Sequence, residues 1–276
     1  MILTIQKTCY PKIMNPTRMI AMAMVLSSVS LVSGEEILEI ATDRPDFVES
    51  ALTVPRHHFQ FETSAAVVDD DSGGVESTLW ITPTLLRYGL FDRWELRLET
   101  AGYASVEEKT GSNTTLDESG WSDVALGVKW HTADGHDALP AQAWLLHTDL
   151  DTGQGVFKGR GVRASLRWVG EWDFQGIQAF GLMAGYASNK DDLDERYGAG
   201  VFGAVLGQQW TAKFRSFFEL AAPQIASDEH GGDVATLDIG VAYLLRPNWQ
   251  LDGAVYIGIT DETPDVLYTI GLSALF

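Results

Sequence analysis

The chain has 276 residues, of which 45% are hydrophobic and 21% charged, and its formal net charge is −19 at pH 7. Phosphate binding requires clustered lysine and arginine, and the sequence has no basic tract, so we expect no nucleic-acid partner. The single cysteine, Cys9, excludes a disulfide framework and a thiolate metal site.

Residues 1–34 are typical of a secretory signal peptide. Three basic residues, Lys7, Lys12 and Arg18, precede an uncharged apolar stretch from Met19 to Val32, and small residues follow. The alternative is an N-terminal anchor helix, although the apolar stretch is shorter than the roughly 20 residues that a spanning helix needs. We therefore expect export, with cleavage after residue 34.

Residues 35–56 form a periplasmic lead-in, and from residue 57 onward apolar and polar residues alternate, as in "RWELRLETAGY". The alternation predicts about twelve strands, at 57–68, 76–88, 94–104, 121–131, 140–150, 161–172, 176–187, 198–210, 214–223, 234–245, 249–260 and 266–276. Most are longer than the roughly 5–6 residues of an average soluble strand. Their length fits tilted strands that cross a bilayer.

The predicted connections alternate in length and charge. "GLFDR", "DFQG", "TAK" and "RPN" are tight, whereas "DDDSGG", "VEEKTGSNTTLDESG" and "SNKDDLDERYG" are polar and acidic. Bacterial outer-membrane barrels have short periplasmic turns, longer external loops and an even number of strands. We therefore predict an all-β fold over residues 57–276, a transmembrane antiparallel up-and-down β-barrel of about 12 strands. A soluble barrel of the lipocalin kind is the alternative.

In such a barrel the apolar face of each strand contacts lipid and the charged face lines the lumen. The side chains predicted to line the lumen are Glu62, Arg87, Glu95, Arg97, Glu99, Asp123, Lys129, His147, Arg163, Arg167, Glu171, Glu219, Asp238 and Asp252. If Tyr88 and Trp94 pair across the "GLFDR" turn, Arg87 lies opposite Glu95 and forms an ion pair with it. For each of these charges the alternative is a purely structural, paired residue.

The lead-in carries the charged residues Asp43, Arg44 and Asp46. It could fold into the lumen as a plug that pairs with lumen charges, or it could be a periplasmic tether against the lower rim. Both interpretations are compatible with the sequence.

Two groups of residues have oxygen or nitrogen ligands that could hold a cation. His147, Asp149 and Asp151 share one face at the end of a strand, and the run 69–71 is three aspartates. The alternative is ordinary solvated charge, with residues 69–71 at a loop tip. His57 and His58 point to opposite faces of the predicted first strand, so they cannot chelate one metal. We expect no metal site and no cofactor.

The chain ends on "DVLYTIGLSALF", an alternating strand with an aromatic last residue. Closing the barrel removes the unpaired edges that would otherwise aggregate, so the last strand must pair with the first. Its predicted lipid-facing residues are Tyr268, Ile270, Leu272, Ala274 and Phe276. Tyr268, Ile270, Leu272 and Phe276 resemble the signal that barrel-assembly machinery recognises.

Several segments together resemble one protein family. They are "TDRPDF" (42–47), "RYGLFDRWELRL" (87–98), "GWSDVALGVKW" (120–130), "NWQLDGAVYIGIT" (248–260) and the final "GLSALF". The chain resembles, over about residues 41–276, Gram-negative outer-membrane transporters catalogued under the meta-pathway of phenol degradation. The resemblance implies an outer-membrane barrel for uptake of small solutes, aromatic or hydrophobic ones among them.

We therefore expect a passive transporter or pore in the outer membrane, with lipid, lipopolysaccharide, barrel-assembly machinery and a small-molecule solute as partners. Its acidic mouth predicts a weak preference for cations. One alternative is a structural or adhesive barrel without conductance. Another is a lipid hydrolase, which needs a histidine within hydrogen-bond reach of a lipid-facing serine. The pattern places His131, His136 and His230 in connections and His147 inward, so we expect no catalytic residues.

Overall fold

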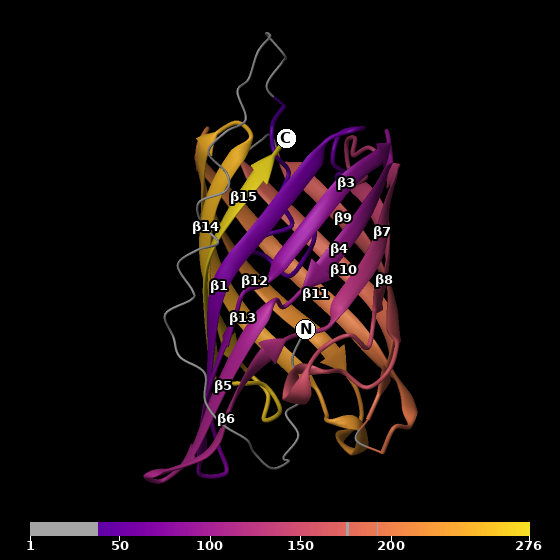
Figure 1. Ribbon diagram of the computed structural model, residues 1–276. Coiled ribbons are helices and arrows are strands. Elements are labelled where there is room, and N and C mark those ends of the chain that lie inside the picture. The colour runs from indigo at the N-terminus through magenta and orange to yellow at the C-terminus, as the bar shows by residue number, and fades with distance from the viewer. Residues whose placement is uncertain (1–37, 175–176, 192) are drawn as a thin grey trace.

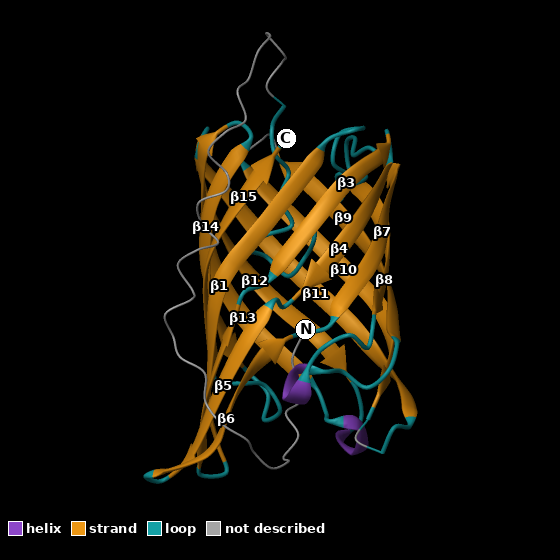
Figure 2. Cartoon of the chain, in the orientation of Figure 1, coloured by secondary structure: helices purple, strands orange, loops and turns teal. Residues whose placement is uncertain are grey.

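The computed structural model describes residues 38–174, 177–191 and 193–276, and the predicted signal peptide lies outside them. The chain forms a closed antiparallel β-barrel (Figures 1 and 2). Its strands are β1 (Phe59–Ser72), β2 (Val75–Ile81), β3 (Thr84–Phe91), β4 (Trp94–Thr100), β5 (Tyr103–Thr110), β6 (Asn113–Trp121), β7 (Val124–Ala133), β8 (Ala141–Asp149), β9 (Arg163–Phe174), β10 (Gln178–Lys190), β11 (Arg196–Thr211), β12 (Phe214–Ile225), β13 (Val234–Arg246), β14 (Trp249–Gly258) and β15 (Val266–Leu275).

Three strands of the wall are interrupted, so fifteen named segments make a barrel of twelve strands. The interruptions lie at residues 82–83 between β2 and β3, at 101–102 between β4 and β5, and at 122–123 between β6 and β7. Pro83 has no N–H to donate to a neighbouring strand, and Gly102 has a φ of 77° that favours glycine. The predicted all-β, twelve-stranded, up-and-down barrel is confirmed.

The first and last strands close the barrel. β1 pairs with β15 from Gln60 opposite Leu275 to Asp69 opposite Val266. Beyond the end of β15, Phe59 and Phe276 exchange backbone hydrogen bonds of 3.0 and 2.8 Å. The Phe276 ring is about half exposed and lies edge-on to Trp249. The chain therefore ends in the seam, as the alternation predicts.

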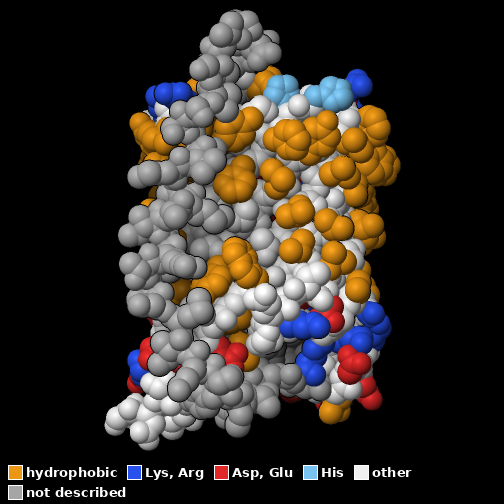
Figure 3. Space-filling model, viewed as in Figure 1, with side chains coloured by type: hydrophobic (Ala, Val, Ile, Leu, Met, Phe, Trp, Pro, Cys, Tyr) orange, Lys and Arg blue, Asp and Glu red, His pale blue; other side chains and the backbone are white. Residues whose placement is uncertain are grey.

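The outer face carries exposed apolar side chains in two aromatic rows. One row contains Phe59, Tyr88, Trp94, Trp130 and Trp144, and the other contains Trp80, Tyr103, Trp121, Tyr186 and Tyr268. Figure 3 shows hydrophobic side chains over much of the described face, most of its acidic and basic ones toward the lower end, and a few Lys or Arg side chains at the upper rim. Aromatic girdles around an apolar band are the surface that a lipid bilayer requires of a barrel.

The two ends of the barrel differ. The end that holds Phe276 carries the connections at residues 92–93, 134–140, 212–213 and 247–248, and we call it the short-turn rim (Figure 1, top). The opposite end, the long-loop rim, carries longer loops at 150–162, 226–233 and 259–265. Two 3-10 turns lie there, η2 (Gly155–Phe157) and η3 (Asp228–His230). Within the described residues, no helix has the length and hydropathy to cross a membrane.

Two connections that the sequence predicts as loops are extended strands instead. β1 continues to Ser72, and β5 and β6 form a projecting hairpin that replaces the predicted loop "VEEKTGSNTTLDESG". Glycines at 73, 74 and 111, all with positive φ, make two-residue turns possible there. Beyond the membrane both faces of a strand are wet, so the apolar alternation that reveals a strand disappears.

The start of the barrel also needs correction. Residues 69–71 lie in β1 and not at a loop tip. His57 and His58 precede β1, which begins at Phe59, because His57 adopts a φ of 65° in a turn. The prediction that the two histidines lie on opposite faces of a strand is therefore wrong.

Candidate functional site

The segment 38–58 runs through the interior of the barrel. At the short-turn rim the N–H of Ile40 donates to the carbonyl of Pro247 at 2.8 Å. The chain then reaches Phe47, whose N–H donates to Glu219 on β12 at 2.7 Å. It returns to the same rim, where the N–H of His57 donates to the carbonyl of Gly89 at 2.7 Å. Figure 2 shows this loop within the wall of strands. We call residues 38–58 the N-terminal segment.

Asp43 of this segment lies among three cations of the wall. Its carboxylate lies 2.6 Å from Arg97 Nη1, 2.9 Å from Lys129 Nζ and 3.3 Å from Arg87 Nη1. Burial opposes the ionisation of Asp43, but the three positive charges outweigh it and hold the pKa of Asp43 well below its usual range. Asp43 is therefore a buried anion that three strands of the wall hold in place.

The wall supplies its own acids around these cations. Arg87 makes a two-pronged contact with Glu95, with Nε 2.8 Å from Oε1 and Nη2 2.9 Å from Oε2, and its Nη1 lies 3.0 Å from Glu62. Glu62 in turn accepts from the N–H of Asp43, and Glu95 accepts from the N–H of Val54. Cations and anions thus alternate through one network that includes the backbone of the segment.

The predicted pair of Arg87 and Glu95 is confirmed, but the pairing from which it was argued is wrong. Tyr88 lies opposite Leu96 and not opposite Trp94, because the pairing of β3 with β4 shifts near the turn. Arg87 therefore reaches Glu95 diagonally. An irregularity of one residue at a turn leaves no trace in the alternation, so the sequence cannot show it.

A second acid of the segment, Glu49, extends the network toward β9. Its Oε2 lies 2.7 Å from Arg97 Nη2 and 3.8 Å from Lys129 Nζ, and its Oε1 lies 3.4 Å from Arg167 Nη1. On the same strand, Glu171 accepts a hydrogen bond of 2.5 Å from the N–H of Ala51.

On the other side of the barrel the segment has fewer ionic contacts. Arg44 lies 3.1 Å from Asp252 on β14, and Asp46 lies 3.5 Å from Arg215 on β12. Burial raises the pKa of Asp46 above its ordinary value, and the nearby charge of Arg215 only partly offsets it. The remaining anchor is Glu219, which accepts from the N–H groups of Phe47 and Val48, both at 2.7 Å.

All fourteen side chains that the sequence assigns to the lumen lie in buried or half-buried positions. Those that contact the N-terminal segment are Glu62, Arg87, Glu95, Arg97, Lys129, Arg167, Glu171, Glu219 and Asp252. The others are Glu99, Asp123, His147, Arg163 and Asp238. Asp123 accepts from the N–H groups of Thr152, Gly153 and Gly159 and pairs with Arg163, so it fastens the loop 150–162.

The candidate cation group does not converge. His147 lies 3.5 Å from both Glu99 and Asp149, but Asp151 turns away and lies 3.5 Å from Lys158. Within the part of the chain that the structure describes, no group of three or more His, Cys, Asp or Glu side chains is placed to hold a metal ion.

His131 is predicted to lie in a connection, and this prediction is wrong. It lies in β7 and is buried, with Nδ1 2.8 Å from the carbonyl of Ala51 and Nε2 2.7 Å from Asp134. Hydrogen bonds from His131 and from Arg93 lower the pKa of the exposed Asp134. The histidine therefore contacts the N-terminal segment, from the inner face of the wall.

Further polar residues face the segment. They are Gln60, Arg215, Gln250 and Tyr256, which contact Ala41, Asp46, Thr42 and Pro45 in that order. Strand alternation could have identified them, because each lies an even number of residues from a predicted lumen charge on its own strand. Three of them are uncharged and Arg215 lies beside a turn, so the pattern of charge within strands does not reveal them.

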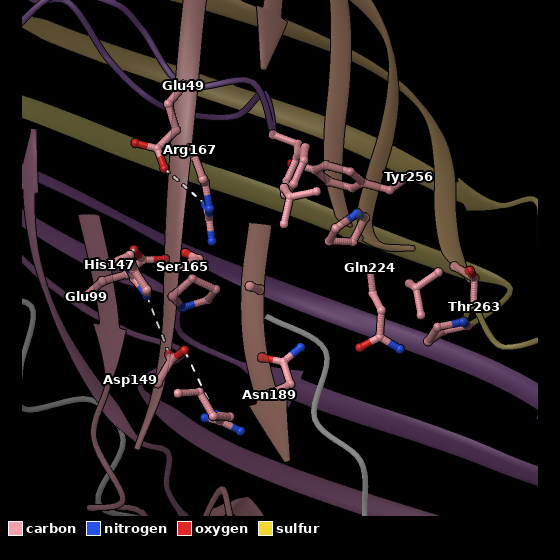
Figure 4. A pocket seen from close by; sticks show the side chains of 18 of the residues that line it. Glu49, Glu99, His147, Asp149, Ser165, Arg167, Asn189, Gln224, Tyr256 and Thr263 are labelled. Carbon is pink, nitrogen blue, oxygen red and sulfur yellow. Dashed lines mark hydrogen bonds and ion pairs between the residues drawn. The ribbon is translucent and has the colours of Figure 1, made fainter. Parts of the chain in front are cut away.

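Among the described residues, two cavities of the lumen border the segment, one on each side. The larger, about 740 Å³, extends to residues 261–264 of the long-loop rim and is lined by His147, Arg167 and Tyr256 (Figure 4). The smaller, about 320 Å³, lies toward the short-turn rim and is lined by Gln178 and Lys213. Asp46 lines both cavities. The N-terminal segment is thus the partition between them.

An apolar belt, a closed wall of twelve strands and a polar interior define the class of outer-membrane-type β-barrels. A family model described as "Putative MetA-pathway of phenol degradation" matches residues 42–276. The chain belongs to that family.

Two solved structures have a similar fold. An outer membrane channel from Pseudomonas putida F1 is 13% identical, with a TM-score of 0.61 over 84% of this chain and 99% of that one. The NanC porin is also 13% identical, with a TM-score of 0.51 over 78% of this chain and 98% of that one. At such identity the likeness is one of fold. None of the curated proteins compared with this chain matches it.

Proposed function

We propose that the protein is a passive outer-membrane transporter for small solutes, including aromatic or hydrophobic ones. In this proposal residues 1–34 direct export, the short-turn rim faces the periplasm and the long-loop rim faces the cell exterior. The family and the lipid-adapted outer surface support the location. The observation that carries the function is the pair of lumen cavities, about 740 and 320 Å³, that only a non-covalently held segment separates.

In this mechanism the N-terminal segment acts as the plug. Its ion pairs and hydrogen bonds keep it seated, and solute passes when part of it leaves the wall. The larger cavity reaches the acidic residues Asp70, Asp261 and Glu262 near the outer mouth. Negative charge at a mouth raises the local cation concentration, so ions that leak through should be mainly cations.

Single-channel recording in planar bilayers tests the pore. A variant that lacks residues 38–54 should conduct several-fold more than the full mature protein, because the partition is gone. Heat-modifiable gel mobility should show that the variant is folded, and Glu107→Gln on the exposed hairpin is the matched control. Equal, negligible conductance of a folded deletion variant and the full protein would contradict the pore.

Uptake experiments test the solute class. Cells that lack the protein should accumulate radiolabelled toluene more slowly than complemented cells. The protein should also fractionate with the outer membrane. Unchanged uptake together with a leaky outer membrane would instead support a structural barrel.

A further inference from the structure

Two neighbouring strands present an uncharged inner face to the lumen. The inward positions of β10 include Gly181, Met183, Gly185 and Ala187, and those of β11 include Ala199, Val201, Gly203 and Val205. The two sets lie opposite one another in the strand pairing, from Gly181 opposite Val205 to Ala187 opposite Ala199. We call these eight positions the apolar lane. An uncharged stripe of this length is unusual in a lumen that is otherwise polar.

The apolar lane runs from one cavity to the other. Ala187 and Val201 line the larger cavity. Gly181 and Val205 line the smaller cavity. Between them, Val48 of the N-terminal segment packs in one cluster with Met183, Val201 and Val205, and Phe47 packs against that cluster. Phe47 and Val48 are therefore the part of the partition that covers the lane.

Two glycines of the lane form a hollow that Val48 fills. A Cβ built on Gly203 would lie 2.7 Å from Val48 Cγ2 and 3.0 Å from Phe47 Cδ1. A Cβ on Gly181 would lie 2.7 Å from Val205 Cγ1 and 3.0 Å from Val48 Cγ1. These distances are shorter than ordinary contact, so an alanine at either position would require Val48 or its neighbours to shift. We call this hollow the Val48 notch.

The contacts of the segment with this part of the wall are apolar. The ion pairs of Asp43 and Glu49 go to Arg87, Arg97, Lys129 and Arg167, on β3, β4, β7 and β9. Over β10 and β11 the segment offers the side chains of Phe47 and Val48. An apolar side chain in a hollow has no directional partner to lose, so another apolar group of similar size can replace it.

We propose that the apolar lane is the solute-binding site, and that Val48 occupies a notch that takes an uncharged aromatic ring or branched alkyl group during passage. This inference rests on the proposed transport function and deepens it. The lane itself carries no ionised group to compensate a charged solute for lost hydration, and the flanking Arg167, Glu171 and Glu219 are already engaged by the N-terminal segment. An uncharged apolar solute gains by leaving water.

Crystals soaked in bromobenzene test the site, since bromine can be located by its anomalous scattering. Val48→Ala empties the notch, so its crystals should show a bromine peak between Gly181 and Gly203. The double variant Val48→Ala with Gly203→Ala should show none, because the added methyl group fills the hollow. Val48→Ala with Gly207→Ala is the matched control on the same strand, since a Cβ on Gly207 would meet only Ala179, at 3.6 Å or more. This control should keep the peak.

A bromine peak elsewhere in the lumen, no peak in Val48→Ala, or a peak that persists with Gly203→Ala would overturn the site. Uptake separates this outcome from failure of transport itself. Toluene uptake through Gly203→Ala should fall at least fivefold relative to Gly207→Ala, while potassium conductance should not fall, because Val48 is displaced. Equal toluene uptake by the two variants would refute the lane and leave the transporter standing. Bromobenzene in the notch without any toluene uptake would refute the solute's passage and leave only a binding hollow.

Discussion

The two sides of the lumen hold the same segment by different physics. On the side of β3, β4 and β7, Asp43 lies among three cations, and every contact is directional and buried. On the side of β10 and β11, Val48 fills a hollow between glycines. Removing one partner of a buried ion pair costs about 3–5 kcal/mol, because it leaves a charge unpaired in the interior. Burying a valine contributes roughly 1.5–3 kcal/mol and requires no particular partner. The segment should therefore leave the apolar side first, once the hydrogen bonds from Phe47 and Val48 to Glu219 break, and pivot on the charged side.

The largest effect is expected from Asp43→Asn, which tests whether the charged side holds the N-terminal segment. It leaves Arg97 and Lys129 without their shared anion, so the charged side should release the segment. The open probability in planar bilayers should rise by at least a hundredfold, which is what about 3 kcal/mol corresponds to. Glu107→Gln on the projecting hairpin is the control, and its open probability should match that of the unaltered protein. An Asp43→Asn protein that stays closed would show that the ionic side does not hold the segment.

A smaller effect is expected from Val48→Ala, which weakens the apolar side alone. The loss of two buried methyl groups, at about 0.8 kcal/mol each, should raise the open probability by about tenfold. Gly207→Ala, just outside the apolar lane, should leave the open probability unchanged. A larger effect for Val48→Ala than for Asp43→Asn in the same recordings would reverse the proposed order of release.

Acidity should act through Asp46. Its pKa is raised in the seated segment, first by burial, and Arg215 and Asp252 modify the effect in opposite directions. A group whose pKa is higher in one state binds more protons there, so lowering the pH toward that pKa favours the seated state. The pKa of Asp43 is shifted in the opposite direction, below its ordinary value. Asp43 therefore destabilises the seated state only once the pH falls to the ordinary pKa that it has in the released segment.

We therefore expect the open probability to fall as the pH is lowered from neutrality toward the raised pKa of Asp46. Asp46→Asn should flatten this dependence, which recordings at matched ionic strength would measure. A rise in open probability over the same pH range would contradict the assignment.

The smallest effect is expected at the border between the two sides. Arg167 lies 3.4 Å from Glu49, and neither side chain is fully buried. Partly exposed pairs contribute about 0–1 kcal/mol. Arg167→Gln should therefore change the open probability less than about fivefold, and a change as large as that of Asp43→Asn would extend the ionic side onto β9.

The barrel could be predicted from the sequence because lipid imposes a period-two pattern on every strand that it touches. The same pattern identified Glu62, Arg97 and Lys129 as inward-facing. A plug that carries Asp43 was one of two predicted alternatives, but the lumen charges that Asp43 meets could not be predicted. Asp43 precedes Arg97 by 54 residues and Lys129 by 86, and a contact at such separation leaves no local signal. The apolar lane escaped for a different reason. Apart from Lys190 and Arg196 at their ends, β10 and β11 lack charge on both faces, so alternation does not distinguish the inner face from the outer.

The route of the N-terminal segment has a mechanical consequence. Ile40 meets Pro247 and His57 meets Gly89 at one rim, so the segment goes in and comes out through the same mouth. No free end has to be threaded through the lumen when it withdraws. Tension applied to the chain before Ile40 would peel its contacts one after another and would not shear them all together. The force needed would then be set by the strongest single contact, the Asp43 cluster, and not by the sum over the whole segment.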